Sequence, residues 1–289
     1  MGTLVTIQVV ADGRDVAAAM DCAFGWFREI EARCTRFDPE SELMRLCRET
    51  GRAVPVSTVL FEGVRFAAEV ARLSGGAFDP AVGRRMEERG FDRNYRTGAR
   101  VNRGAADGAA SWRDIELDAE RRTIRLHREL TLDMGAVAKG LAADAAARAL
   151  AQFRDFAIDA GGDLYLGGRN PEGGPWRVGI RHPQRPLDLI ARVAVSNRAV
   201  CTSGGYERPM AGKAGEHHIL DPRRGRSPRG VASATVIAPH AMLADALATA
   251  AFVLGPERGL DLLDRAGVEG LIVTEELAEF RTRSLDDAA

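Results

Sequence analysis

The residues best suited to chemistry gather in one stretch of the chain, residues 130–150. Asp133, Lys139 and Asp144 place two carboxylates and an ammonium group where a small-residue turn meets an Ala- and Leu-rich helix. Amide N–H groups at a helix start bind anions, and a lysine there adds a fixed positive charge. Lys139 is followed by Gly140 rather than by Ser or Thr, so the stretch is not a Walker loop. It indicates either an anion site or a plain helix start with a polar cap and a solvated lysine.

A second candidate site lies in a strongly apolar helix that we expect from about Pro239 to Leu254. Asp245 and Thr249 are four residues apart in it, so they share one face. A carboxylate in so apolar a helix is costly to bury unless it is paired or binds a cation. The two oxygen ligands together would suit a hard cation such as Mg²⁺. The spacing alone favours the alternative, a half-exposed Asp stabilised by the helix dipole.

A third candidate is the histidine pair His217 and His218, which precedes a strand-like Ile-Leu and an Asp-Pro turn. Alternation along a strand predicts that one histidine faces inward and the other outward. An inward histidine beside a phosphate can act as a general acid or base, and a hydrogen-bonded loop histidine is the alternative. Ser203 lacks the nucleophile-elbow pattern, so we interpret it as a phosphate-binding or structural hydroxyl.

The elements that must position these residues follow from the hydrophobic periodicity. A strand opens the chain, and helices are expected over residues 14–34 and about 57–73, with a short helix capped by Ser41 between them. Residues 84–112 are polar and Arg-rich, which predicts a surface excursion. Strands are expected at 130–132, on either side of 118–122, in a strand, Gly-Gly turn, strand unit over 156–168, and at 176–180, 190–195 and 234–238.

The loop after the second long helix, residues 74–80, contains two glycines before an aromatic residue and a carboxylate. Such a tight loop predicts that Phe78 and Asp79 are exposed. The alternative is a helix C-cap followed by a phenylalanine of the core.

Composition and charge exclude several classes of protein. The 289 residues are 45% hydrophobic and 28% charged, with a net charge of −1, which gives no bulk electrostatic case for nucleic acid or an anionic membrane. No run of eighteen apolar residues exists, so we expect no membrane span. The four cysteines show neither a disulfide framework nor metal-ligand spacing. The N-terminus has no signal-peptide pattern, which predicts a cytoplasmic protein for the chain as it stands.

An ordered set of short motifs extends over nearly the whole chain. They are Met1-Gly2-Thr3, Thr35-Arg36-Phe37, Ser41-Glu42-Leu43, Gly76-Ala77-Phe78-Asp79-Pro80, Leu132-Asp133-Met134-Gly135-Ala136 with Lys139-Gly140, Asp159-Ala160-Gly161-Gly162-Asp163, Thr202-Ser203-Gly204, His218-Ile219-Leu220-Asp221-Pro222 and Asp245-Ala246-Leu247-Ala248-Thr249. In this order they resemble the ApbE family, the FAD:protein FMN transferases. Many members of that family carry an export signal and a lipid-attachment cysteine before the Met-Gly-Thr strand. A trimmed N-terminus is therefore the alternative to a cytoplasmic member.

The resemblance implies a fold and a reaction. The fold would be a single α+β domain over residues 1–289, ApbE-like and T-fold-like, with antiparallel sheets and packed helices. The reaction would be Mg²⁺-dependent: FAD is cleaved at its pyrophosphate, FMN passes to a Thr or Ser hydroxyl of a target flavoprotein, and AMP leaves. Phosphoryl transfer of this kind needs positioning and charge neutralisation more than covalent help from the protein.

The resemblance also implies roles for particular residues. Asp245 and Thr249 would hold the metal together with backbone oxygens of Ala136 and Ala248. The FAD site would be lined by Met1, Phe37, Ala77, Phe78, Asp79, Asp133, Lys139 and Ile219. His218 would be the acid or base, and Asp245 would serve catalysis through the metal.

Two other functions use the same residues and stay open at this point. A metal-dependent FAD pyrophosphatase would release FMN and AMP, with water replacing the target hydroxyl. A non-catalytic FAD-binding protein is the third possibility, although a storage site has no need of a cation at the pyrophosphate.

Overall fold

The computed structural model describes residues 2–95, 97–101, 109–210, 212–213 and 215–286. The helices are α1 (Arg14–Cys34), α2 (Glu42–Arg48), α3 (Thr58–Leu73), α4 (Gly83–Glu88), α5 (Ala138–Leu150), α6 (Ala241–Leu254), α7 (Pro256–Ala266) and α8 (Arg283–Asp286), with 3₁₀ turns η1 (Pro80–Val82), η2 (Trp112–Asp114) and η3 (Ala151–Phe153). The strands are β1 (Val5–Val9), β2 (Ala53–Pro55), β3 (Ile115–Asp118), β4 (Thr123–Leu126), β5 (Phe156–Ala160), β6 (Leu164–Gly167), β7 (Trp176–Arg181), β8 (Leu189–Val195), β9 (Arg198–Gly204), β10 (Val231–Ala238), β11 (Glu269–Thr274) and β12 (Glu279–Arg281).

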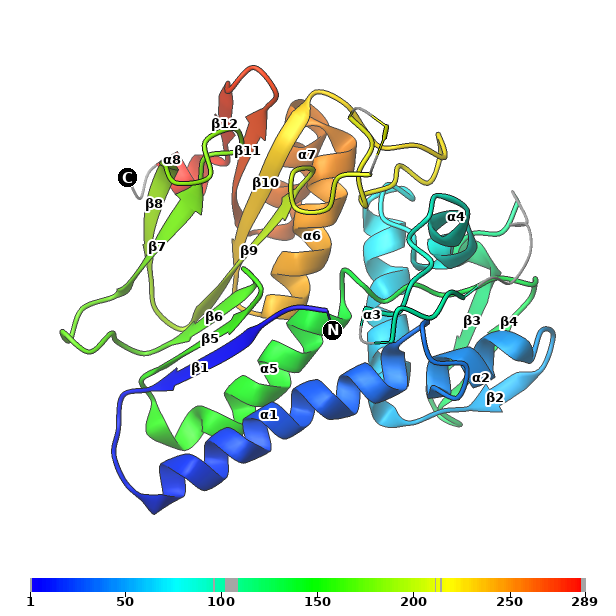
Figure 1. Cartoon of the computed structure of the whole chain (residues 1–289), viewed down its shortest axis with the longest axis horizontal. Coiled ribbons are helices and arrows are strands. Elements are labelled where there is room, and N and C mark those ends of the chain that lie inside the picture. The colour runs from blue at the N-terminus through cyan, green and yellow to red at the C-terminus, as the bar shows by residue number, and fades with distance from the viewer. Residues whose placement is uncertain (1, 96, 102–108, 211, 214, 287–289) are drawn as a thin grey trace.

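A seven-stranded sheet in the order β1-β5-β6-β9-β10-β11-β12 is the centre of the fold, and its paired strands are all antiparallel (Figure 1). Two smaller antiparallel sheets accompany it, β2-β4-β3 and β7-β8. The predicted α+β class with antiparallel sheets is therefore confirmed.

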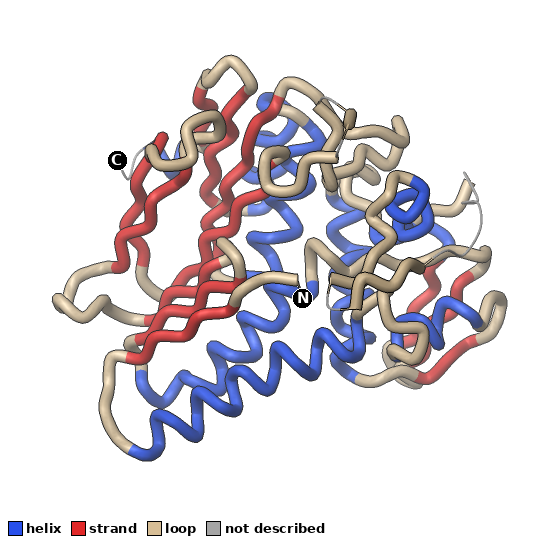
Figure 2. The backbone as a smooth tube through the Cα atoms, in the orientation of Figure 1, coloured by secondary structure: helices blue, strands red, loops and turns tan. Residues whose placement is uncertain are grey.

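Helices cover one face of the large sheet and a two-stranded ribbon covers the other. Helices α5 and α6 pack on the strands, and α1 runs along α5 on the outer side (Figure 2). Phe27, Ile30 and Ile158 belong to the buried core between these helices and the sheet. On the opposite face, Trp176 of β7 and Leu285 of α8 pack with Leu271 in a second, smaller core.

The long helices form where the apolar periodicity places them. In α1, Ala23, Phe27 and Ile30 share the buried stripe, as the spacing requires. Ser41 caps α2 as predicted, because its hydroxyl accepts a hydrogen bond from the Met44 amide at 3.1 Å. Helix α6 is apolar on nearly all sides because β9, β10, α5 and α7 surround it.

Three local predictions are wrong. Residues 130–132 form no strand, since the Leu132 amide donates to Cys47 Sγ (3.4 Å) and the Thr131 carbonyl accepts from the Gly83 amide (2.9 Å). The Arg-rich segment 84–112 is not wholly a surface excursion, because it contains most of α4, whose Met86 is buried; residues 102–108 of the segment lie outside the described residues.

The third wrong prediction concerns the start of α6. Pro239 does not stand in its first turn, because the helix begins two residues later at Ala241, after an extended His240.

Candidate active site

A half-buried lysine between two buried carboxylates is the centre of the candidate site. Lys139 Nζ lies 3.0 Å from Asp163 Oδ2 and 3.1 Å from Asp245 Oδ2, and it donates a hydrogen bond to the Gly135 carbonyl at 3.1 Å. The side chains of Asp163 and Asp245 are only 4% and 5% exposed. Three distant parts of the chain meet here: the first turn of α5, the β5–β6 turn and the second turn of α6.

The electrostatics of the cluster are set by burial and by its two negative charges. Burial, together with the neighbouring Asp163 carboxylate, raises the pKa of Asp245 to about 7, while Lys139 opposes that rise. Burial disfavours the Lys139 ammonium, but the two carboxylates outweigh it and raise the pKa of Lys139 above its ordinary value. One ammonium group thus faces two carboxylates, which leaves unbalanced negative charge in a buried place.

The close approach of α5 to α6 brings Lys139 to Asp245. A Cβ atom on Gly140 would lie 2.5 Å from the carbonyl oxygen of Ala241 and from the amide nitrogen of Met242, so the contact requires glycine. Asp144, one turn further along α5, accepts hydrogen bonds from the backbone amides of Ala241 (2.7 Å) and Met242 (3.0 Å), the first residues of α6. Its carboxylate therefore caps α6, rather than completing a site at the start of its own helix.

The predicted pair Asp245 and Thr249 does share a face of α6. The Thr249 hydroxyl lies 3.0 Å from the Ser203 hydroxyl of β9, in a part-buried contact. Asp245 is 4% exposed, which rules out the half-exposed helix-start Asp that the spacing alone favoured. Ala136 lies in the turn before α5, and Ala248 is fully buried between Asp245 and Thr249 along α6.

Asp133 is held by an arginine that the sequence analysis did not single out. Arg36 Nε lies 2.7 Å from Asp133 Oδ2, and the Gly135 amide donates to Asp133 Oδ1 at 2.8 Å. Burial alone would raise the pKa of Asp133, but Arg36 and the Gly135 amide outweigh it and hold that pKa below its usual value. The Arg36 guanidinium also stacks over the half-buried ring of Phe37, 4.2 Å from its centroid.

The loop before η1 differs from the prediction. Phe78 is 5% exposed and belongs to the core, so the expectation that it is presented to solvent is wrong. Gly75 and Gly76 adopt left-handed backbone (φ of 60° and 81°) and turn the chain inward, which buries the aromatic ring after α3. Asp79 is part-buried and caps η1 by accepting from the Ala81 amide at 2.8 Å. Ala77 is also buried.

His218 stands beside the lysine–carboxylate cluster. Its Nδ1 is buried and has no hydrogen-bond partner in the part of the chain that the structure describes. Burial above all, then the charge of Arg208, lowers the pKa of His218 to about 3, and Lys139 and Asp133 also act on it. The imidazole is therefore neutral at pH 7, with one ring nitrogen not engaged by the protein.

The segment that carries His218 is not a strand, and neither histidine faces outward. His217 is 7% exposed, and its ring packs edge-on against Phe252 of α6 with 5.4 Å between centroids. Its Nδ1 accepts a hydrogen bond from the Ile219 amide at 3.3 Å, and Ile219 itself is buried. The strand prediction fails because pairing stops at one isolated bridge, between His217 and Pro209, while the His217 amide and carbonyl bond to the Ser227 side chain.

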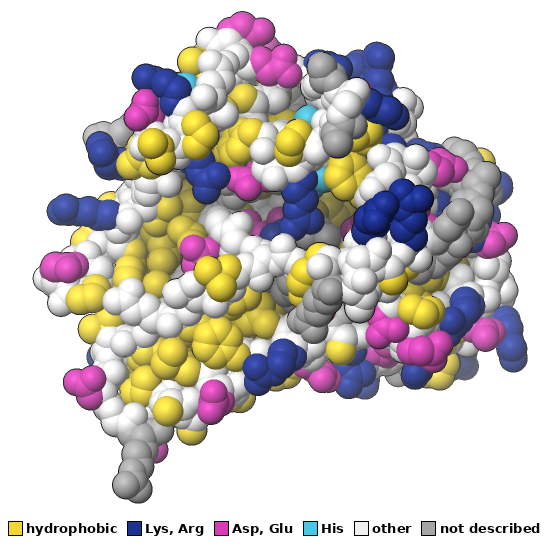
Figure 3. Space-filling view, viewed as in Figure 1, with side chains coloured by type: hydrophobic (Ala, Val, Ile, Leu, Met, Phe, Trp, Pro, Cys, Tyr) yellow, Lys and Arg dark blue, Asp and Glu magenta, His cyan; other side chains and the backbone are white. Residues whose placement is uncertain are grey.

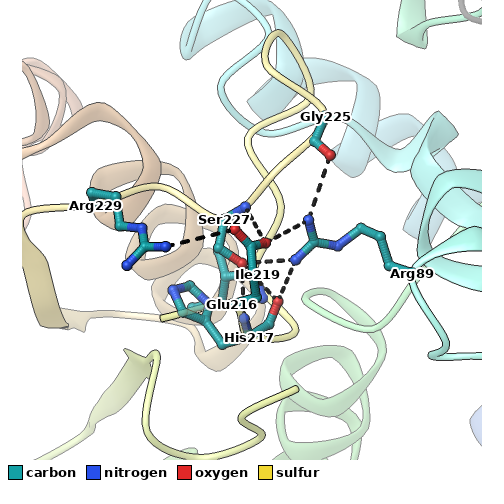
Figure 4. Close-up of polar contacts among 7 residues, drawn as sticks. All are labelled: Arg89, Glu216, His217, Ile219, Gly225, Ser227 and Arg229. Carbon is teal, nitrogen blue, oxygen red and sulfur yellow. Dashed lines mark hydrogen bonds and ion pairs between the residues drawn. The ribbon is translucent and has the colours of Figure 1, made fainter. Parts of the chain in front are cut away.

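Arg89, the residue after α4, anchors the segment that carries the two histidines through its guanidinium group (Figure 4). Its guanidinium donates to the His217 carbonyl (2.8 Å) and to Ser227 Oγ (2.7 Å), and pairs with Glu216 at 3.0 Å. The Ser227 hydroxyl in turn joins the amide and the carbonyl of His217, both at 2.9 Å. Burial and the charge of Arg89 lower the pKa of His217, which suits a neutral, structural histidine.

The structure thus brings together part of the predicted site. Lys139, Asp245, Asp133 and His218 interact through contacts or charge, whereas Asp79 lies in a separate environment with Arg85 and Arg113. Figure 3 shows the viewed face hollowed near its centre, where basic, acidic and histidine side chains gather. Met1 lies outside the described residues.

The sequence analysis gave no role to four residues of the site, Asp163, Arg36, Arg208 and Arg89, although Asp163 and Arg36 stand in the motifs that carry the resemblance. A carboxylate between two apolar strands was a usable signal for Asp163. Arg89 had no such signal, because its partners His217, Ser227 and Glu216 are far away along the chain.

No group of three or more His, Cys, Asp or Glu side chains that could hold a metal ion occurs within the described ranges. A metal at Asp245 would therefore depend on hydroxyl and backbone oxygens as well. Among the helices that the structure describes, none combines the length and the apolar character needed to cross a membrane.

The fold and the site define a class of protein through solved structures of similar architecture. The ApbE protein of Thermotoga maritima superposes with a TM-score of 0.87 at 29% identity, covering 99% of this chain and 96% of that one. The flavin transferase ApbE of Vibrio cholerae gives a TM-score of 0.84 at 26% identity, covering 100% of this chain and 96% of its own. This architecture is that of flavin-transferase-like α+β proteins.

The chain belongs to the ApbE family, whose model matches residues 1–272. Curated relatives named FAD:protein FMN transferase come from Rhodobacter capsulatus (32% identical over 97% of this chain), Haemophilus influenzae (26% over 98%) and Treponema pallidum (33% over 94%). The alignments cover 55%, 87% and 82% of those three proteins. The resemblance to this family of transferases, predicted from the motifs, is confirmed.

Proposed function

We propose that the protein is a Mg²⁺-dependent FAD:protein FMN transferase that acts on a flavoprotein carrying an acceptor Thr or Ser. The observation that carries the proposal is the contact of Lys139 with the buried carboxylates of Asp163 and Asp245, beside a neutral His218 in a chain of the ApbE family. Relatives with the same architecture carry that activity in their names.

In the proposed reaction, the acceptor oxygen attacks the FMN phosphorus of FAD. A new P–O bond forms, the P–O bond to the AMP half breaks, and AMP leaves with the electron pair of that bond. The acceptor loses its proton, and the unengaged Nδ1 of His218 can accept it when the substrate's phosphates add negative charge nearby. Lys139 supplies positive charge to the phosphates, and Asp163 and Asp245 fix its position.

The donor set fits the proposed metal. The Asp245 carboxylate, the Thr249 hydroxyl and the backbone oxygens of Ala136 and Ala248 are all hard oxygen ligands, as Mg²⁺ prefers. The unbalanced negative charge around Lys139 favours a cation there. A bound divalent ion would neutralise charge on the pyrophosphate.

The remaining candidates divide by their surroundings. Phe37 and Asp133 both contact Arg36, which places them together beside the site and supports their contact with FAD. Ala77, Phe78 and Ile219 are buried, so we propose that they shape the wall rather than touch a ligand with their side chains. Asp79 and Met1 stay proposals from the family resemblance.

We also propose that residues 1–289 form a single domain, because β1 joins the same sheet as the C-terminal β11 and β12. The cytoplasmic location stays a prediction.

The test is to separate the nucleotides formed from FAD, with Mg²⁺ and with EDTA, in the presence and absence of an FMN-binding acceptor domain. A transferase forms AMP and labelled acceptor in equal amounts, and only when Mg²⁺ and acceptor are both present. AMP together with free FMN and no labelling would mean a pyrophosphatase. Intact bound FAD in every arm would leave a binding protein and overturn the proposal.

A further inference from the structure

A second cavity lies apart from the candidate active site. It has a volume of about 830 Å³ and is formed by the last turns of α5, the start of β5, the end of β6 and the β8–β9 turn. Small-molecule sites commonly enclose about 300–1,000 Å³. None of the residues proposed to bind FAD or the metal lines it.

The rim of this cavity carries three arginines that make few contacts with the protein. Arg148, Arg154 and Arg169 all line it and are exposed. Within the described part of the chain, Arg148 and Arg154 form no side-chain hydrogen bond or ion pair, and Arg169 reaches only the Gly173 carbonyl at 3.5 Å. Guanidinium groups in this state are available to an anion.

The two carboxylates that line the cavity are already engaged by backbone amides. Asp144 accepts from Ala241 and Met242 of α6, as described above. Asp155 Oδ1 accepts from the Arg169 amide at 2.8 Å. Three arginines against two carboxylates leave the lining with one excess positive charge, although Arg148 also acts on Asp144.

An aromatic wall stands beside these arginines. The half-buried ring of Tyr165 stacks on Phe156, with 6.0 Å between centroids and 17° between planes. Gly167 adjoins it and cannot carry a Cβ, which would lie 2.7 Å from Phe156. A flat ring can therefore approach this wall without meeting a side chain from Gly167.

One strained backbone position, Arg154, lies at the same place. Arg154 (φ 61°) and Asn197 (φ 55°) are two of four non-glycine residues with positive φ among those described, and both line the cavity. Arg154 is the more unusual, because its ψ of −50° lies outside the left-handed helical region. Strained residues of this kind cluster at ligand sites.

We propose that this cavity is a nucleotide-binding site, in which the base lies against Tyr165 and the phosphates lie between Arg148, Arg154 and Arg169. The site is independent of the flavin transferase function. Its position does connect it to the catalytic helices, because Asp144 lines the cavity and caps α6, which carries Asp245.

Calorimetric titration of the full chain with ADP tests the proposal. The double variant Arg148→Gln/Arg169→Gln is expected to bind ADP at least about ten-fold more weakly, since it removes two charge-assisted contacts. The matched control Arg177→Gln/Arg258→Gln removes the same charge at exposed positions elsewhere and is expected to bind ADP as the parent does. Unchanged melting temperatures verify that both variants are folded.

Two further arms separate a nucleotide from a simple anion. Tyr165→Leu is expected to weaken ADP binding but to leave the weaker binding of inorganic phosphate unchanged. The proposal is overturned if the cavity variant binds ADP like the control, or if inorganic phosphate binds as tightly as ADP.

Discussion

Lys139 is one of only two lysines in a chain of 289 residues, the other being the exposed Lys213. Every other basic residue of the Lys and Arg kind in the chain is an arginine. A planar guanidinium cannot substitute for a compact ammonium between two buried carboxylates. The single Nζ atom of Lys139 contacts both carboxylates and the Gly135 carbonyl at about 3 Å, which the planar guanidinium group of an arginine could not do.

Replacing Lys139 by Met tests this role. Two buried carboxylates would lose their common partner, so we expect a loss of about 3 kcal/mol in the free energy of unfolding. Transferase activity should fall by at least about 100-fold, because charge that stabilises the transition state is removed. Chemical denaturation and initial rates measure the two effects. Lys213→Met is the matched control and should change neither; equal behaviour of the two variants would contradict the role of Lys139.

His218 predicts a pH dependence of stability. Its folded-state pKa of about 3 is below the ordinary value of 6.5, so between these values the unfolded chain binds a proton that the folded chain excludes. Stability from this group is complete above pH 6.5 and is lost as the pH falls toward 3. Arg208, His217 and Lys139 oppose protonation, and Asp133 favours it. In the His218→Asn variant the free energy of unfolding should fall less steeply as the pH is lowered, by up to about 1 kcal/mol per pH unit. Parallel curves for the two proteins would contradict this.

At the scale of elements, the contact of α5 with α6 decides whether the site exists. Gly140→Ala would place a methyl group 2.5 Å from the α6 backbone and force the helices apart. We expect a loss of about 1–3 kcal/mol in stability, with reduced activity because Lys139 moves away from Asp245. Gly25→Ala in α1 is the control, since nothing lies within 4 Å of the new atom. It should be neutral or stabilising by about 0.5–1 kcal/mol. Thermal unfolding distinguishes them, and a harmless Gly140→Ala would refute the close contact.

The segment that presents His218 depends on α4 through Arg89. Arg89→Met removes the ties to His217, Ser227 and Glu216, so the imidazole should lose its fixed position. We expect kcat to fall by about ten-fold or more while KM for FAD changes little, which is the signature of a positioning residue. Arg72→Met, which breaks only an exposed pair with Glu69, is the control. A rise in KM with kcat unchanged would place Arg89 in substrate binding instead.

Periodicity and motifs predict the long helices and strands well, because the residues within each element carry the pattern that determines it. Helices α1, α3 and α5 and the β5–β6 hairpin lie where the patterns place them, as does α6 apart from its start. Contacts between distant segments have no local signal, which is why the burial of Phe78 stayed an alternative and Arg89 was given no role. Lys139, Asp245, Asp133 and His218 could be nominated from the sequence, but the sharing of Lys139 by Asp163 and Asp245 required the fold.

For the whole molecule, one sheet joins both ends of the described chain, and α1 packs on α5. We therefore expect one cooperative unfolding transition, with coincident near- and far-ultraviolet circular dichroism curves. Two separate transitions would contradict the proposed single domain.

The most direct test of the central claim is the intact mass of an FMN-binding acceptor domain after incubation with FAD, Mg²⁺ and this protein. The account predicts a mass gain of one FMN on a Thr or Ser of the acceptor. The gain should be lost with EDTA and with the variant Asp245→Ala, but kept with the exposed control Asp261→Ala. An unlabelled acceptor beside intact FAD, or full labelling by Asp245→Ala, would contradict the account.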